Sequence, residues 1–105
     1  MARLVWTEPA LSDLDEIAEY IALEDPIAAR SLVQRVFSAV ERLERHPDSG
    51  TVPDELEGSR YREMVSGPCR VIYRHSKGEV LIFYIMRSER ELRNFLLSER
   101  DDRGN

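Results

Sequence analysis

The sequence predicts a single α+β domain in which an antiparallel helical hairpin packs on one face of a sheet. The first observation is a pair of β-rich runs between Pro68 and Arg87, separated by the two-residue turn Lys77-Gly78. The second is a pair of amphipathic helical patterns before them, joined by a link so short that the helices must run antiparallel. The predicted order is an N-terminal strand, the helical hairpin, a three-stranded antiparallel meander and a C-terminal helix.

The first helix is predicted from its start signal and its apolar stripe. Arg3 to Trp6 is a short apolar run that we interpret as an edge strand. Thr7 suits the N-cap, with Glu8 and Pro9 in the first turn, where a negative charge is favourable and a missing N–H costs nothing. Apolar residues then recur at spacings of three and four, at Leu11, Leu14, Ile17, Ala18 and Ile21.

The second helix repeats the same start signal. Asp25 is the expected cap, and Pro26 is the first helical residue. Its stripe consists of Ala29, Leu32, Val33, Val36, Phe37, Val40 and Leu43. The run from His46 to Gly50, which reads HPDSG, is expected to end it in a turn.

The remainder is predicted to be a loop, three strands and a last helix. Thr51 to Ser59 shows no periodicity and is expected to be a surface loop, whereas Arg60 to Val65 has strand character. Ser88 can cap a helix from Glu89 to Ser98, whose small apolar face is Leu92, Phe95 and Leu96. We expect residues 100–105 to be a frayed tail, so the predicted domain spans residues 1–99.

The hairpin turn predicts which residues of its two strands face each other. A primed turn at Lys77-Gly78 pairs Ser76 with Glu79. The cross-strand pairs on one face are then Arg74 with Leu81, Ile72 with Phe83, and Arg70 with Ile85. The other face carries Cys69, Val71, Tyr73, Val80, Ile82, Tyr84 and Met86 and is suited to covering helices. The face that mixes arginines with large apolar side chains is therefore predicted to be a binding surface.

Composition limits the possible functions. With 105 residues, of which 42% are hydrophobic, the chain forms one domain. The single cysteine, the absence of a membrane-length apolar run and the lack of a signal peptide lead us to expect a cytoplasmic protein. The net charge of −5 disfavours nonspecific nucleic-acid binding, although residues 60–105 carry 10 basic and 7 acidic side chains. Nearly all the cations are arginines, which suit bidentate contacts to carboxylates or phosphates.

Side chains suited to nucleophilic or metal chemistry are few. Cys69 is expected to face the helices as a core residue, and one cysteine with two separated histidines lacks metal-ligand spacing. His46 belongs to a helix-ending turn, and His75 lies on the face opposite Arg70. We therefore predict no metal, no cofactor and no catalytic residue.

Four strings occur in order along the chain: TEPALSDL near the start, RLERHPDSG closing the second helix, GPCRVIYR in the hairpin and IMRSEREL near the end. Together they resemble the RelE/ParE superfamily of bacterial type II toxins. The resemblance covers nearly the whole chain. It implies a small cytoplasmic toxin that is held inactive by an antitoxin whose disordered C-terminal segment folds over it.

The superfamily contains RelE-like ribosome-dependent mRNA endonucleases and ParE-like inhibitors of DNA gyrase. Arg70 and Arg90 match arginine positions of the nucleases, but their two lysines fall at about Tyr61 and Glu63, and their tyrosine falls at about Leu96. Cleaving a phosphodiester needs groups that transfer protons, which arginine does not supply. The resemblance is therefore closest to the ParE branch, with a nuclease, or a degenerate toxin that only binds antitoxin, as the alternatives.

This interpretation assigns two binding surfaces. The first is a target-binding segment that consists of Arg87, Ser88, Glu89, Arg90 and Arg93. The second is an antitoxin-binding face that consists of Arg70, Ile72, Arg74, Leu81, Phe83 and Ile85. The expected partners are DNA gyrase and a ParD-like antitoxin in a hetero-oligomer, without membrane or sequence-specific nucleic-acid binding.

Overall fold

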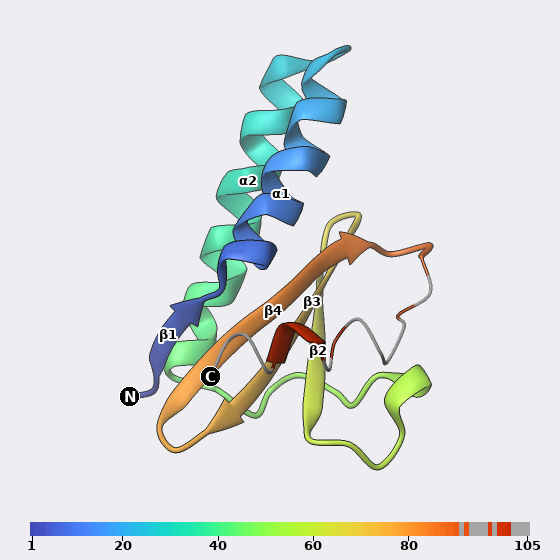
Figure 1. The fold of residues 1–105 in the computed structure, drawn as a ribbon. Coiled ribbons are helices and arrows are strands. Elements are labelled where there is room, and N and C mark those ends of the chain that lie inside the picture. Colours follow the sequence, from blue (N-terminus) through green and yellow to red (C-terminus); the bar gives the residue numbers. More distant parts are fainter. Residues whose placement is uncertain (91, 93–96, 98, 102–105) are drawn as a thin grey trace.

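The computed structural model describes residues 1–90, 92, 97 and 99–101, and it has the predicted α+β fold (Figure 1). The helices and strands are β1 (Arg3–Trp6), α1 (Glu8–Ala22), α2 (Pro26–Glu41), β2 (Tyr61–Ser66), β3 (Cys69–Ser76) and β4 (Glu79–Arg87). Two short 3₁₀ turns, η1 (Arg42–Glu44) and η2 (Asp54–Leu56), lie between α2 and β2. In the described part of the chain, no helix is long and apolar enough to span a bilayer.

The four strands form one sheet in the order β1-β4-β3-β2. β1 lies at the edge, as predicted, and runs parallel to β4 with Trp6 opposite Ile82. Because β1 ends there, no strand of the described residues pairs with the second half of β4 on that side. This unpaired edge of β4 forms one wall of the candidate site.

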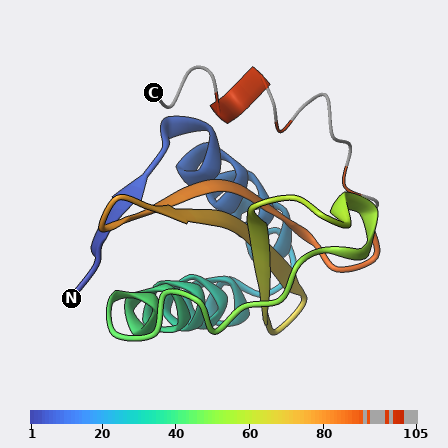
Figure 2. The same ribbon diagram turned by 90° about the horizontal axis from the view of Figure 1, so that it is seen from below.

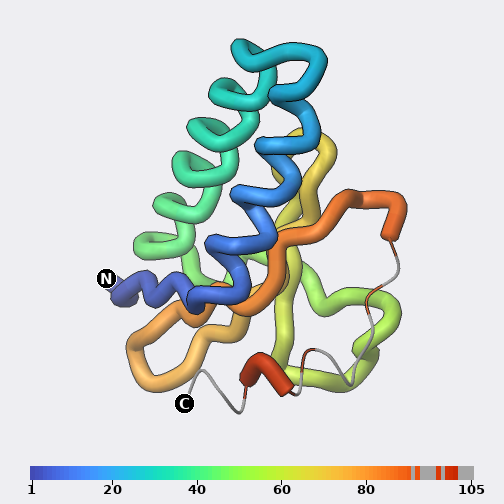
Figure 3. The backbone as a smooth tube through the Cα atoms, turned by 45° about the horizontal axis from the view of Figure 1, so that its top comes forward, coloured from blue at the N-terminus to red at the C-terminus, as the bar shows by residue number. Residues whose placement is uncertain are grey.

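Both helices begin where their capping residues predict. The Thr7 hydroxyl accepts a hydrogen bond from the Ala10 N–H at 3.4 Å and donates one to the Ile82 carbonyl at 2.7 Å. The Asp25 carboxylate accepts from the Ala28 N–H at 3.0 Å. The two helices run side by side and antiparallel, as Figure 3 shows, so the predicted helical hairpin is confirmed.

Two hydrophobic clusters cover the two faces of the sheet. The first joins α1 and α2 to the sheet and contains Ala10, Leu14, Leu32, Val36, Val40, Leu43, Cys69, Val71, Tyr73, Val80, Ile82 and Ile85. The second lies on the opposite face and contains Leu56, Ile72, Leu81, Phe83, Met86, Leu92 and Leu97. In Figure 2, α2 and the short helical piece at residues 99–101 accordingly lie on opposite sides of the sheet.

The expectation that the second face is open was wrong. Ile72 and Phe83 are 0% exposed, and the other predicted members of that face, Arg70, Arg74 and Leu81, are also buried. Leu56 covers part of this face from the segment that the sequence predicts to be a plain surface loop. Leu92 and Leu97 add cover from beyond β4.

The predicted register holds at the turn and fails further along the hairpin. Lys77 and Gly78 both have positive φ, at 52° and 77°, as a primed turn requires. Arg74 pairs with Leu81 as predicted, but the register then shifts between Ile72 and Tyr73, because β4 contains one extra residue at a β-bulge. Ile72 therefore faces Tyr84 rather than Phe83, and Arg70 faces Met86 rather than Ile85.

The bulge also reverses the alternation of side chains along β4. Ile85, predicted to lie beside Arg70, packs instead in the first cluster under the helices. Met86, predicted to face the helices, packs in the second cluster. The predicted antitoxin-binding face therefore loses one member by register as well as its exposure.

The chain after β4 differs from the predicted helix. Ser88 and Glu89 form a turn and Leu92 is not helical, so the predicted helix start at Glu89 was wrong. Leu97 and residues 99–101 are helical, while the other residues of the predicted helix, at positions 91, 93–96 and 98, lie outside the described residues. Arg100 and Asp101, expected to fray, both form ion pairs with the body of the fold. The remainder of the predicted tail, residues 102–105, also lies outside the described residues.

Candidate functional site

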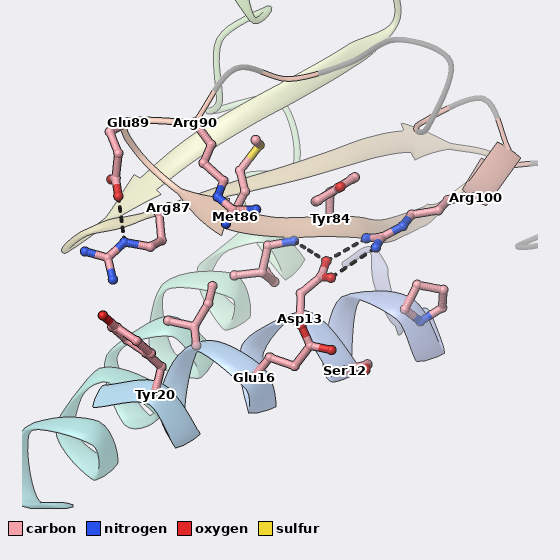
Figure 4. Close-up of a pocket in the computed structure, with 13 residues that line it drawn as sticks. Ser12, Asp13, Glu16, Tyr20, Tyr84, Met86, Arg87, Glu89, Arg90 and Arg100 are labelled. Atoms are coloured by element: carbon pink, nitrogen blue, oxygen red, sulfur yellow. Dashed lines mark hydrogen bonds and ion pairs between the residues drawn. The ribbon is translucent and has the colours of Figure 1, made fainter. Parts of the chain in front are cut away.

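A groove of about 1300 Å³ runs between α1 and the unpaired edge of β4 (Figure 4). One wall comes from α1 and the other from β4 and the residues that follow it. The residues that line it include Asp13, Glu16, Ile17, Tyr20, Tyr84, Arg87, Glu89, Arg90 and Arg100. The groove exists because β1 ends at Trp6, which leaves α1 as the element beside the second half of β4.

Side chains satisfy backbone groups on this edge of β4. The Asp13 carboxylate accepts a hydrogen bond from the Ile85 N–H at 3.0 Å, and the Arg100 guanidinium donates to the Phe83 carbonyl at 3.0 Å. The same two side chains form a bidentate ion pair at 2.6 and 3.0 Å, and Arg100 lies 3.7 Å from the centre of the Tyr84 ring. An ion pair thus supplies the donor and the acceptor that a neighbouring strand would offer.

The groove has walls of opposite charge. On the α1 side, Asp13 and Glu16 supply carboxylates, next to the apolar side chain of Ile17. On the other side, Arg87 and Arg90 supply guanidinium groups. Such a surface is complementary to a partner segment that carries charges of both signs around an apolar centre.

The predicted target-binding segment forms one rim of this groove. The Ser88 N–H donates to the Pro68 carbonyl at 2.8 Å, and the Arg90 N–H donates to the Arg87 carbonyl at 3.0 Å. The Arg87 guanidinium contacts the exposed Glu89 carboxylate at 2.7 Å. The structure therefore brings together four of the five predicted residues, and Arg93 lies outside the described residues.

Arg70 is enclosed by two carboxylates. Its guanidinium contacts Glu55 at 2.8 and 2.9 Å and Glu63 at 2.5 Å, and its side chain is only 9% exposed. These hydrogen bonds raise the pKa of Arg70. Arg70, which the sequence assigns to the antitoxin-binding face, is thus paired with carboxylates of the chain itself. Two carboxylates around one guanidinium leave a local excess of negative charge, which repels phosphate.

Acidification should weaken the contact between Arg70 and Glu55. Hydrogen bonds from Arg70 lower the pKa of Glu55 from 4.5 to about 2. A carboxylate with a lowered folded-state pKa stabilises the fold above its unfolded pKa, and the stabilisation is lost as the pH falls from 4.5 towards about 2. Because 24% of the side chain is exposed to screening, we expect a contribution of only about 1–2 kcal/mol. The melting temperatures of wild type and Glu55→Gln should differ at neutral pH and converge towards about pH 2. A difference that is independent of pH would contradict this assignment.

Tyr61 and Arg74 hold the end of the described chain. The Tyr61 hydroxyl donates to Asp101 at 2.5 Å, and Arg74 contacts the same carboxylate at 2.9 Å. Burial, with the nearby Asp101 carboxylate, raises the pKa of Tyr61 to about 12. Tyr61 and Glu63, which occupy the positions where a nuclease would have lysines, are thus both engaged in structural contacts.

Among the described residues, neither histidine forms an acid–base pair beside Arg70 or Arg90. His75 lies 3.0 Å from Asp48 near the turn end of β3, and His46 lies in the exposed turn after η1. Cys69 is 0% exposed in the first cluster, where burial raises the pKa of its thiol. Among the residues that the structure describes, no group of three or more His, Cys, Asp or Glu is arranged to hold a metal ion.

Three residues that contribute to the site were not predicted from the sequence, namely Asp13, Arg100 and Glu55. Asp13 occupies a position that the helical pattern assigns to the acidic back of α1, and Arg100 belongs to the predicted tail. Glu55 lies in an aperiodic loop. None of the three carries a local signal, because each acts through a partner at least 15 residues away in the sequence.

Residues 4–92 match the protein family described as ParE toxin of type II toxin-antitoxin system, parDE. Two curated proteins are similar to this chain. One is Y4kP of Sinorhizobium fredii, which is named as a toxin; it is 36% identical over 89 residues, covering 85% of this chain and 91% of its own length. The other is toxin RelE2 of Caulobacter vibrioides, which is 38% identical over 72 residues, covering 69% of this chain and 77% of its own length.

A solved structure is similar along most of the chain. It is described as the chromosomal ParDE TA system from P. aeruginosa. The match has a TM-score of 0.73 and 27% sequence identity, and it covers 85% of this chain and 98% of the other. Sequence and fold thus point to the same group of proteins.

Proposed function

Since the chain belongs to the ParE family of toxins of type II toxin–antitoxin systems, we propose that it inhibits DNA gyrase by binding and is neutralised by a cognate ParD-like antitoxin. The contact surface for gyrase is the turn from Arg87 to Arg90 together with Arg93. This turn is exposed and carries cations directly after β4, an internal strand of the sheet. The site of action is the cytoplasm, where gyrase and the antitoxin are found.

The observation that carries this proposal is the enclosure of Arg70 by Glu55 and Glu63. A RelE-like nuclease resembles this chain in having an arginine at this position, where it has to meet the phosphate of the message. Here the guanidinium is already neutralised and largely buried, and the adjacent carboxylates repel a phosphodiester. These facts favour a toxin that acts by binding over one that cleaves RNA.

The antitoxin surface needs a different location from the one predicted. Arg70, Ile72, Arg74, Leu81 and Phe83 are buried, so a partner could reach them only if the chain beyond β4 moved away. The groove between α1 and β4 is open to a partner as the structure stands. We therefore place the ParD-like segment in this groove, where Tyr20 is 68% exposed and charged side chains line both walls.

The decisive experiment compares two assays on the same purified protein. We expect the wild type to block supercoiling by purified gyrase at micromolar concentration and to leave ribosome-bound message intact in a translation extract. Addition of the purified antitoxin should restore supercoiling. Normal supercoiling together with new cuts in ribosome-bound message would establish the nuclease alternative instead. A protein inactive in both assays that still binds its antitoxin would be a degenerate toxin.

A further inference from the structure

Three hydrogen bonds hold the backbone of the target-binding turn and of Leu92, which follows it. The Ser88 N–H donates to the Pro68 carbonyl at 2.8 Å, in the turn between β2 and β3. The Arg90 carbonyl accepts from the Arg70 guanidinium at 3.0 Å, and the Leu92 N–H donates to the Glu55 carboxylate at 3.1 Å. Arg87 is held by β4, whereas residues 88–90 belong to neither a helix nor a strand. The backbone that carries Arg90 is therefore fixed by these bonds together with the one from the Arg90 N–H to the Arg87 carbonyl.

Glu55 is connected to two of these three anchors. Its Oε2 atom accepts both the Leu92 N–H and one Arg70 nitrogen, while its Oε1 atom accepts the other Arg70 nitrogen at 2.9 Å. The same Arg70 nitrogen that contacts Oε2 also donates to the Arg90 carbonyl. One carboxylate therefore helps to orient Arg70, which Glu63 also contacts, and binds the Leu92 N–H directly.

Glu63 provides a comparison within the same cluster. It contacts Arg70 at 2.5 Å, but its side chain forms no hydrogen bond to the described residues that follow β4. If the carboxylates served only to balance the charge of Arg70, then Glu55 and Glu63 would be equivalent. The additional bond from Glu55 to Leu92 makes them different.

We propose that Glu55 is a positioning residue for target inhibition, which fixes the backbone at Arg90 and Leu92 through Arg70 and the Leu92 N–H. The proposal rests on the proposed function, in which this segment contacts gyrase. Glu55 itself does not touch the target. It keeps the backbone of Arg90 in one arrangement relative to Arg87, which β4 holds, and this spares binding the entropic cost of ordering that backbone.

The test compares three substitutions that each replace one carboxylate by an amide of the same shape. They are Glu55→Gln, Glu63→Gln and, as a control, Glu57→Gln, which alters an exposed side chain two residues further along the same loop. Two quantities are measured for each folded variant. The first is the exchange rate of the Leu92 amide proton by NMR, and the second is the concentration that half-inhibits gyrase supercoiling. Circular dichroism and thermal melts confirm that each variant is folded.

In Glu55→Gln we expect the Leu92 amide to exchange at least about tenfold faster, and the half-inhibitory concentration to rise by about tenfold or more. Glu63→Gln should change both quantities less, and Glu57→Gln should match the wild type. Equal effects of Glu55→Gln and Glu63→Gln, or an unchanged Leu92 amide in Glu55→Gln, would overturn the proposal. If the wild type does not inhibit gyrase, the proposed function fails, and the Leu92 amide then decides alone whether Glu55 fixes this segment.

Discussion

Replacing Arg87, Arg90 and Arg93 together by Gln is expected to abolish gyrase inhibition while the protein stays folded. Charge-assisted hydrogen bonds contribute about 1.5–3 kcal/mol each, so losing two or three of them should weaken target binding by at least about a hundredfold. The fold should tolerate the change, because the pair between Arg87 and Glu89 is exposed and such pairs contribute little to stability. The Arg90 carbonyl that accepts from Arg70 is a backbone atom and remains in place. Gyrase supercoiling, cell growth after induction and a thermal melt measure these effects.

The matched control removes the same charge elsewhere. Arg30, Arg42 and Arg45 are exposed arginines on α2 and the turns after it, and their triple replacement by Gln changes the net charge by the same amount. This control should remain toxic. The first variant should lose more of its toxicity than of its affinity for the antitoxin. The reason is that Ile17, Tyr20 and Tyr84 still line the groove and offer apolar contacts to the antitoxin. Full toxicity of the first variant would show that the turn is ordinary solvated surface. Equal losses of toxicity in the two triple variants would indicate an effect of net charge.

Elements with local signals were predictable from the sequence. Thr7 and Asp25 begin helices because each side chain accepts a hydrogen bond from a backbone N–H three residues later. Lys77-Gly78 forms the hairpin turn because both residues adopt positive φ. In each case the deciding interaction lies within a few residues of the signal, so a pattern in the sequence is sufficient to identify it.

The β-bulge and the covered sheet face could not be predicted in the same way. The run from Val80 to Met86 is apolar at every position, so a one-residue shift leaves the pattern unchanged and only the three-dimensional packing selects the register. Leu56 belongs to the same hydrophobic cluster as Ile72 and Phe83, although its stretch of sequence shows no periodicity. Such a contact depends on the path of the whole chain, which has no signature in the local sequence.

The candidate site was likewise predictable only in part. The cation cluster from Arg87 to Arg90 follows directly from its spacing after an apolar strand. The groove was missed, because it depends on where β1 ends relative to β4 and on a pair, Asp13 with Arg100, whose members are 87 residues apart in the sequence. The role of Glu55 was missed for the same reason.

Phe83→Asp is expected to unfold the protein or to detach the second hydrophobic cluster, with a loss of several kcal/mol in stability. The Phe83 side chain is 0% exposed and packs edge-on against Tyr61, with ring centres 6.0 Å apart. Truncating a buried phenylalanine costs about 3–5 kcal/mol, and burying a carboxylate adds to this cost. Since a domain of this size has a total stability of about 5–15 kcal/mol, the sum is a large part of it. Urea denaturation, with the release of Leu97 followed by NMR, measures the loss.

Val65→Asp is the matched control, because it places the same charge on a neighbouring part of the sheet where the side chain is 61% exposed. It should change the melting temperature by only a few degrees. The comparison also separates two views of this sheet face. If the face is a free docking surface, as the sequence alone predicted, Phe83→Asp will keep its stability and lose only antitoxin affinity. If the chain covers the face with Leu56, Leu92 and Leu97, stability must fall first, because the carboxylate can escape burial only when those residues separate from the sheet. A Phe83→Asp protein as stable as Val65→Asp would therefore contradict the packing of the second cluster.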